Sequence, residues 1–283
     1  MRAAFLLNER SGSMDRELLE RIAGDSDAQV DWFGLDELEA AVSQRPDRLV
    51  VAGGDGSVAH VAAAAAAAQI PLAVIPGGTA NDFARAHNLP LELDAACALA
   101  LSDASLLACD LGWAGDQPFV NTASAGLAVR AAHRASRWKR VAGPSAYLVG
   151  ALHAAAEVKP FACRIEGHSQ VLYEGRAWQV IVAVSGAFGW GSSVESSPGD
   201  KRLDVHVLEA GSRLWFPVRA VGMRMGKVRA QPGVQHLRAS PIEVHLEGHT
   251  EFNVDGDVTE LAEPAPFRVE PSAFRLLVPT LSG

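Results

Sequence analysis

A short apolar run that stops at a glycine-rich turn constrains this chain more than any other feature. Residues 49–52 are typical of a buried strand, and Gly53-Gly54-Asp55-Gly56-Ser57 follows at once. Glycine has no Cβ, so this turn can take positive φ angles and let a ligand touch the main chain. The nearly all-alanine residues 58–68 predict a helix directly behind it. A strand, a glycine-rich turn and a helix in this order present backbone N–H groups and the positive helix end to an anion, most often a phosphate.

A second turn of the same kind follows the next apolar run. Residues 72–75 predict a strand, and Pro76-Gly77-Gly78-Thr79-Ala80-Asn81-Asp82-Phe83-Ala84 comes after it, with Thr79 as the expected N-cap of a helix. Turns that follow neighbouring parallel strands lie at the same carboxyl edge of a sheet, where open α/β folds bind ligands. The alternative is a purely structural turn, because the first turn has neither the Walker A lysine nor the dinucleotide-binding glycine spacing.

The pattern of apolar runs divides the chain into two predicted domains. In residues 1–117, strand-like and helix-like runs alternate, which predicts an α/β domain with a parallel sheet. In residues 118–283, a predicted helix pair at about residues 129–157 precedes short runs with period-two alternation, typical of a mostly antiparallel β-sandwich. The expected strands are residues 3–7, 29–33, 49–52, 72–75, 178–184, 203–208, 242–246, 267–270 and 274–278, and the expected helices are residues 14–23, 35–42, 58–68, 81–87 and 94–102.

Several motifs, in order along the chain, resemble the catalytic domain shared by diacylglycerol kinases, sphingosine kinases and soluble bacterial lipid kinases. The two glycine-rich turns carry most of the resemblance. The other motifs are Asn8-Glu9-Arg10-Ser11-Gly12, Asn121-Thr122-Ala123-Ser124-Ala125-Gly126, Gly143-Pro144-Ser145-Ala146-Tyr147, the run from Ser197 to Val205, and Val254-Asp255-Gly256-Asp257. The resemblance implies a nucleotide domain, a β-rich domain and an active site in the cleft between them.

The resemblance also implies that the first domain binds ATP. Kinases mainly position phosphates, so backbone N–H groups in the two turns and hydroxyl groups beside them would hold the nucleotide. Asp55 is either a Mg²⁺ ligand by way of water or a residue that holds the turn, and helix capping explains Asn81 and Asp82 nearly as well as nucleotide contact does. The implied ATP-binding residues are Asn8, Ser11, Gly12, Gly53, Gly54, Asp55, Gly56, Ser57, Thr79, Asn81 and Asp82.

The implied general base for the acceptor hydroxyl is Asp257. The family carries glutamate at this position, and aspartate is one methylene shorter, which removes about 1.5 Å of reach. A base must come within about 2.6–3.2 Å of the group that gives up the proton, directly or through one water. An ordinary hairpin turn is the alternative, since Asp-Gly is a standard hairpin sequence.

The resemblance places a structural Mg²⁺ site in the segment that contains Asp200. The carboxylate of Asp200 and backbone oxygens of Ser197 and Arg202 are suitable ligands for a hard cation. A surface carboxylate paired with Lys201 is the alternative.

The composition of the chain limits the classes of molecule that the protein is expected to bind. The net charge of −8 argues against a nucleic-acid partner, which a basic face would indicate. Three cysteines without metal spacing indicate reduced thiols in a cytoplasmic protein, and no run reaches the roughly 20 apolar residues of a membrane span. Basic and aromatic residues in 130–140 and 213–229 suit an anionic membrane surface, although amphipathic helices would show them too. We therefore expect a peripheral protein that meets its lipid substrate at the inner face of the membrane, and a long edge strand in the second domain would allow a homodimer.

Three functions remain in competition. The first is an ATP- and Mg²⁺-dependent lipid kinase that acts on a diacylglycerol-like or long-chain-base acceptor. The second is a kinase of the NAD kinase or phosphofructokinase type, which also carries Gly-Gly-Asp-Gly turns. The third is a nucleotide-binding regulator without kinase activity, which is favoured by departures from the family pattern such as Glu9, Ala59-His60 and Asp257.

Overall fold

The protein was analysed as a computed structural model that describes residues 1–8, 16–24, 26–127, 129–130, 159–184, 187–188, 192–193, 201–211 and 232–280. The chain forms two compact units. Unit 1 contains Met1–Leu111 and Glu270–Gly283, and unit 2 contains Gly112–Val269. The sequence places the boundary after residue 117, close to the end of the first segment of unit 1, and does not assign the end of the chain to unit 1. The predicted helix pair at residues 129–157 lies outside the described residues, apart from its first two positions.

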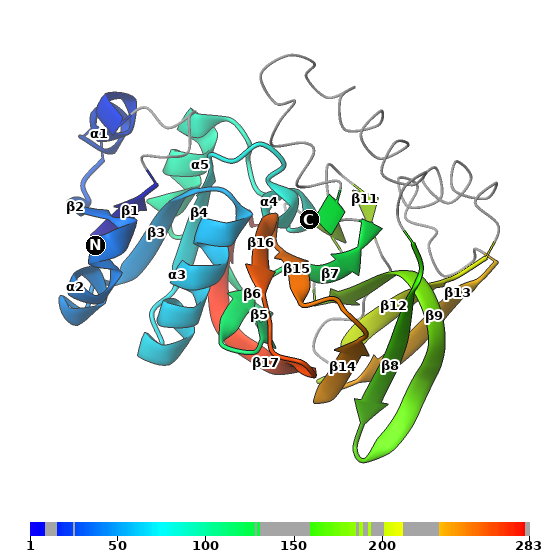
Figure 1. Cartoon of the computed structure of the whole chain (residues 1–283). Helices are drawn as coiled ribbons and strands as arrows, with labels where there is room; N and C mark the ends of the chain where they lie inside the picture. The colour runs from blue at the N-terminus through cyan, green and yellow to red at the C-terminus, as the bar shows by residue number, and fades with distance from the viewer. Residues whose placement is uncertain are drawn as a thin grey trace. The chain divides into compact units, whose positions relative to one another are not determined.

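Unit 1 is built on a parallel sheet (Figure 1). Its strands are β1 (Arg2–Leu7), β2 (Gln29–Gly34), β3 (Arg48–Gly53) and β4 (Leu72–Pro76), in the order β4-β3-β1-β2. The end of β17 (Ala265–Val278) adds a parallel strand beside β4. β1, β3 and β4 are almost entirely buried, which explains why they appear in the sequence as continuous apolar runs.

Helices cover both faces of this sheet. The helical elements are α1 (Arg16–Gly24), the 3₁₀ turn η1 (Leu35–Glu37), α2 (Leu38–Ser43), α3 (Asp55–Ala68), α4 (Asp82–Ala86) and α5 (Leu93–Ala100). On one face, Leu19 of α1 and Cys97 of α5 pack with Phe5 and Ile75 of the sheet. On the other face, α3 packs against β3 and β4. The predicted α/β domain with a parallel sheet is confirmed.

Unit 2 is antiparallel. β5 (Ser105–Ala114) carries the chain into it, and the strand order is β16-β15-β7-β9-β8-β14-β17, with β12 also beside β9 and β13 beside β12. The bounds are β6 (Gln117–Phe119), β7 (Thr122–Gly126), β8 (Phe161–Gly167), β9 (Gln170–Ala183), β12 (Leu203–Glu209), β13 (Val234–Ala239), β14 (Ile242–Leu246), β15 (Glu251–Val254) and β16 (Asp257–Glu260), with a separate pair β10 (Ala187–Phe188) and β11 (Ser192–Ser193). The predicted β-rich, antiparallel character is confirmed.

Two details of the predicted elements were wrong. Residues 267–270 and 274–278 belong to one strand, β17, which crosses from unit 2 into unit 1. The helix expected at 58–68 begins earlier, at Asp55, because the end of the glycine-rich turn is already helical. The edge strands of unit 2 among the described residues, β6, β13 and β16, have 3, 6 and 4 residues, so the predicted homodimer stays a prediction.

Candidate functional site

The two glycine-rich turns of unit 1 lie against each other, backbone to backbone. The N–H of Gly77 donates to the carbonyl oxygen of Gly53 at 2.8 Å. A Cβ placed on Gly78 would lie 2.7 Å from Cα of Gly54, and a Cβ on Gly54 would lie 3.2 Å from Cα of Gly78. A Cβ at position 78 does not fit without moving the backbone of the first turn, and a Cβ at position 54 would be a tight contact.

Asn8, at the end of β1, fastens the first turn from the other side. Its backbone N–H donates to the carbonyl oxygen of Ala52 at 3.0 Å. Its side-chain amide donates to the hydroxyl of Ser57 at 2.8 Å. The carboxyl ends of β1, β3 and β4 therefore meet at one edge of the sheet, as the sequence predicts.

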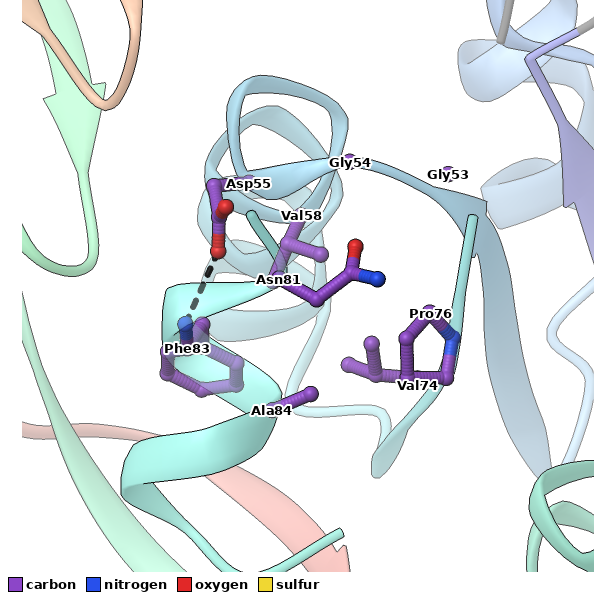
Figure 2. Close-up of a pocket in the computed structure, with 9 residues that line it drawn as sticks. All are labelled: Gly53, Gly54, Asp55, Val58, Val74, Pro76, Asn81, Phe83 and Ala84. Atoms are coloured by element: carbon purple, nitrogen blue, oxygen red, sulfur yellow. Dashed lines mark hydrogen bonds between the residues drawn. The ribbon is translucent and has the colours of Figure 1, made fainter. Parts of the chain in front are cut away.

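Asp55 connects the start of α3 to the start of α4. Its carboxylate accepts the backbone N–H of Phe83 at 2.8 Å and that of Asp82 at 3.2 Å. Figure 2 shows this carboxylate pointing to the first turn of α4. Of the two roles considered for Asp55, the structure shows that it holds the turns together.

The start of α4 differs from the prediction. The N-cap of α4 is Asn81, in a left-handed conformation with φ 52°, and Thr79 is exposed two residues earlier. The side-chain oxygen of Asn81 accepts the N–H of Gly78 at 2.8 Å instead of capping α4. The predicted N-cap at Thr79 was therefore wrong, because Asp55 from another helix supplies the cap. Asp82 lies in the first turn of α4, as the sequence indicates, and its side chain is buried.

These residues line a small depression at the N-terminus of α3. It has an empty volume of about 150 Å³ and is lined by Gly53, Gly54, Asp55, Val58, Val74, Pro76, Asn81, Phe83 and Ala84 (Figure 2). Part of this volume is open solvent, so the depression does not enclose a ligand by itself. Its wall includes Gly53 and Gly54 at the N-terminal end of the 14-residue helix α3, and backbone N–H groups at such an end favour an anion.

Asp257 lies at the tip of a tight hairpin in unit 2. β15 and β16 are joined by Asp255 and Gly256, with φ angles of 46° and 100°. Two positive φ angles are what a two-residue type I′ hairpin requires. Asp257 is the first residue of β16 and its side chain is exposed, so the predicted projection from the turn is present.

Asp255 anchors this hairpin, a role that the sequence analysis missed. Its carboxylate accepts backbone N–H groups of Val120 at 2.7 Å, Asn121 at 3.0 Å and Thr122 at 3.0 Å. The turn that carries Asp257 is thereby fixed to the start of β7. The only sequence signal was an aspartate in an Asp-Gly turn, which hairpins without any such contact also show.

Four predicted site residues lie outside the described residues: Ser11, Gly12, Ser197 and Asp200. Of the predicted Mg²⁺ site, Arg202 alone is described, immediately before β12. Residues 131–140 and 213–229, which contain most of the basic and aromatic residues expected at a membrane surface, also lie outside them.

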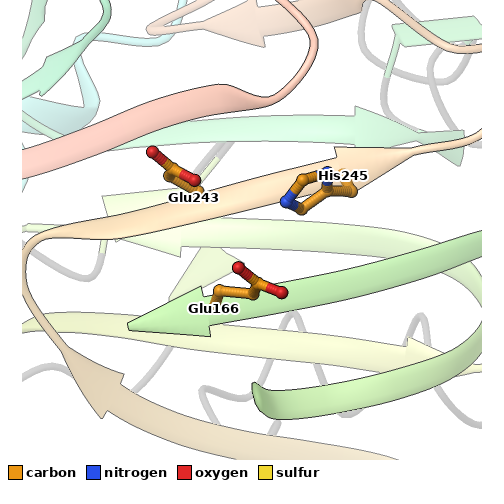
Figure 3. Close-up of side chains that lie close together, drawn as sticks. All are labelled: Glu166, Glu243 and His245. Carbon is orange, nitrogen blue, oxygen red and sulfur yellow. The ribbon is translucent and has the colours of Figure 1, made fainter. Parts of the chain in front are cut away.

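A second group of potential metal ligands lies on the sheet of unit 2. Ligand atoms of Glu166, Glu243 and His245 lie within 4.8 Å of one another (Figure 3). Arg164, however, donates to Glu166 at 2.6 Å and approaches Glu174 at 3.4 Å. Arg164 therefore neutralises part of the charge of Glu166, and Nδ1 of His245 lies 3.8 Å from the carboxylate of Glu263.

The cysteines are not placed for covalent chemistry. All three are free and buried, and burial raises the pKa of Cys97 to about 11 and those of Cys109 and Cys163 to about 12. A thiol with such a pKa is protonated near neutral pH and is a poor nucleophile.

Within the described part of the chain, no helix is long and apolar enough to span a bilayer.

Comparisons with known proteins agree with the motifs. Residues 2–114 match the diacylglycerol kinase catalytic domain, and residues 121–278 match the YegS C-terminal NAD kinase beta sandwich-like domain. A Pseudomonas putida KT2440 protein named "Probable lipid kinase YegS-like" is 31% identical over 266 residues, which cover 89% of this chain and 85% of that protein.

Two solved structures show the same fold. A diacylglycerol kinase from Bacillus anthracis strain Sterne has a TM-score of 0.75 at 22% identity, over 98% of this chain and 96% of that one. An NAD kinase from Archaeoglobus fulgidus, in complex with ATP, has a TM-score of 0.54 at 15% identity, over 98% of this chain and 93% of that one. From its matched domains and its sequence relatives, this chain belongs to the diacylglycerol kinase catalytic domain family, together with the YegS-like lipid kinases.

Proposed function

We propose that this protein is an ATP-dependent lipid kinase that transfers the γ-phosphate of ATP to the hydroxyl of a diacylglycerol-like lipid. The observation that carries the proposal is the meeting of the two glycine turns at the N-terminus of α3, in a chain whose family is named for this reaction. Unit 1 would bind ATP, and unit 2 would supply the general base and bind the acceptor lipid. Because ATP is a cytoplasmic substrate and the acceptor is a lipid, the protein would act at the inner membrane surface.

In the proposed reaction, the acceptor oxygen attacks the γ-phosphorus while the bond to the β,γ-bridging oxygen breaks and ADP leaves. The acceptor proton passes to the carboxylate of Asp257, which is exposed at its hairpin. The N–H groups at the start of α3 and the hydroxyl of Ser57 would hold the phosphates in place. Backbone contacts of this kind act through position and charge, which is where phosphoryl transfer gains most of its rate.

Mg²⁺ would neutralise phosphate charge during transfer. Asp55 brings a carboxylate to the edge where the phosphates would bind, Asp82 follows in the first turn of α4, and carboxylate oxygens suit this ion. Asp55 would then serve both as the cap of α4 and, through water, beside the metal. We also retain the proposal of a separate Mg²⁺ site at Ser197, Asp200 and Arg202.

Substitution of Asp257 tests the proposed base. Asp257→Asn keeps the size of the side chain but cannot take a proton, so transfer to diacylglycerol should fall by about 100-fold or more. The affinity for ATP, measured by calorimetry, should not change. Asp257→Glu restores the reach of the family residue and should keep or raise the rate.

Asp116→Asn is the matched control, because Asp116 is an exposed residue in the turn between β5 and β6 of the same unit. It should leave transfer unchanged. Full activity of Asp257→Asn would show that another group is the base. Tight ATP binding by the wild type without transfer to any lipid would favour a non-catalytic regulator instead.

A further inference from the structure

Two neighbouring strands of unit 2, β8 and β14, carry potential metal ligands on the face of the sheet that is turned away from the core. Ile165 of β8 and Val244 of β14 belong to the main core of the unit. Because side chains alternate along a strand, their neighbours Glu166, Glu243 and His245 lie on the opposite face. Glu166 pairs directly with Glu243, and His245 follows two residues later on β14. Glu243 is exposed and the other two are half-buried, so an ion can reach all three from solvent.

The ligand atoms of these three residues are close enough for one ion, but they do not bind one another. They all lie within 4.8 Å of each other, and no hydrogen bond or ion pair joins His245 to either glutamate. Ligands that lie about 2.1 Å from a metal ion are separated by about 3.4 Å in a tetrahedral site and by about 4.2 Å on opposite sides of the ion. Small rotations of the two glutamate side chains would cover the difference.

His245 supplies an observation that carboxylates alone would not. Its Nε2 is buried and has no hydrogen-bond partner in the described part of the chain. Figure 3 shows the ring beside the two glutamates, with a nitrogen turned toward them. Buried polar atoms normally have a partner, so this nitrogen calls for a bound group.

A further carboxylate lies behind the imidazole. Oε1 of Glu263 is 3.8 Å from Nδ1 of His245. Both oxygens of Glu263 also accept the backbone N–H of Leu246, at 3.2 Å and 3.3 Å, which holds the carboxylate in place. Histidines that bind a metal ion through one ring nitrogen are commonly oriented by a carboxylate at the other.

The charges around the group are not balanced. Nε and Nη2 of Arg164 both contact Oε1 of Glu166, at 2.6 Å and 2.5 Å, so Oε2 of this carboxylate keeps no partner among the described residues. Glu243 has neither a hydrogen bond nor an ion pair to any of them. With Glu174 and Glu263, four carboxylates therefore accompany one guanidinium. Like charges on adjacent strands repel each other, and a divalent cation would remove that repulsion.

We propose that Glu166, Glu243 and His245 bind a Zn²⁺ ion, with Glu263 orienting the imidazole and water completing the coordination. One imidazole nitrogen with two carboxylate oxygens is a donor set that suits Zn²⁺, whereas Mg²⁺ takes oxygen ligands. The ion would join β8 to β14 and stabilise unit 2. It is distinct from the Mg²⁺ of phosphate transfer, and the proposal does not depend on the proposed kinase function.

The test uses the purified full chain without an affinity tag, treated with a chelator and then titrated with ZnCl₂ in a calorimeter. Zn²⁺ should bind and raise the midpoint of thermal unfolding. Glu243→Gln keeps the size of an exposed side chain, so the variant should fold, and it should weaken Zn²⁺ binding by at least about 100-fold, as should His245→Ala. Glu263→Gln should weaken binding by about 10–100-fold, the range of a residue that orients a ligand.

Glu174→Gln is the matched control. It removes the same charge from the neighbouring strand β9, where Glu174 approaches Arg164 at 3.4 Å and does not belong to the ligand group. Screening by salt limits the effect of an exposed charge, so the affinity for Zn²⁺ should fall by no more than about threefold.

Equal losses of affinity in Glu174→Gln and Glu243→Gln would show attraction by charge alone and would overturn the coordination. Unchanged Zn²⁺ binding by both Glu243→Gln and His245→Ala would place the ion elsewhere on the chain. A wild type that shows neither heat of binding nor a higher midpoint with excess Zn²⁺ would overturn the site. Mg²⁺ that displaces Zn²⁺ at equal concentration would overturn the choice of metal. None of these readouts requires kinase activity.

Discussion

At the scale of single residues, the candidate phosphate site depends on two glycines that let the turns approach each other closely. Gly54 and Gly78 bring two backbones closer than a Cβ allows, and the side-chain oxygen of Asn81 fills the remaining space beside Gly78. The sequence predicted that both turns approach a ligand. It could not predict that they also approach each other, because that contact joins residues 24 positions apart.

Gly78→Ala should disrupt this contact. The new Cβ would lie 2.7 Å from Cα of Gly54 and 2.9 Å from the side-chain oxygen of Asn81, so the turns must move apart. We expect a loss of about 1–3 kcal/mol in the free energy of unfolding and weaker binding of ATP, measured by urea denaturation and calorimetry. Gly24→Ala has open space around its Cβ and should change neither quantity. An alanine at position 78 with wild-type ATP affinity would show that the turns do not hold the nucleotide.

At the scale of elements, strands and helices were easier to predict than the contacts between them. The apolar runs located β1, β3, β4 and β14 to within a residue or two, because buried strands need unbroken apolar sequence. β17 was predicted as two strands because Pro271 and Ser272 interrupt its alternation, whereas the structure continues through them. The cap of α4 was missed since Asp55 reaches it from another helix, and no local pattern records that.

Asp55 variants separate its capping role from its proposed role beside Mg²⁺. Asp55→Ala removes both acceptors of the α4 N–H groups and should lower the free energy of unfolding by about 1–2 kcal/mol. Asp55→Asn keeps one acceptor oxygen and should lose less stability, yet it should lose transfer activity if a charge beside the metal is needed. Asp94→Ala, at an exposed position in the first turn of α5, is the control and should cost only a few tenths of a kcal/mol. Wild-type transfer by Asp55→Asn would leave capping as its sole role.

At the scale of the whole molecule, the chain passes from unit 1 to unit 2 through β5 and returns through β17. A return by the last strand cannot be read from composition, because it depends on the pairing of the end of β17 with β4. The burial of Gln179, one polar residue inside an apolar run, could not be predicted either, because it depends on β7 and β12 pairing with β9.

Transfer of phosphate from ATP to diacylglycerol is the measurement that tests the central claim most directly. The purified full chain would be incubated with γ-labelled ATP, Mg²⁺ and diacylglycerol in mixed micelles, and the organic phase would be analysed for labelled phosphatidate. The account predicts a labelled lipid product that requires Asp257 and that does not form when Mg²⁺ is chelated. ATP that binds but yields no labelled product from diacylglycerol or a long-chain base would contradict it.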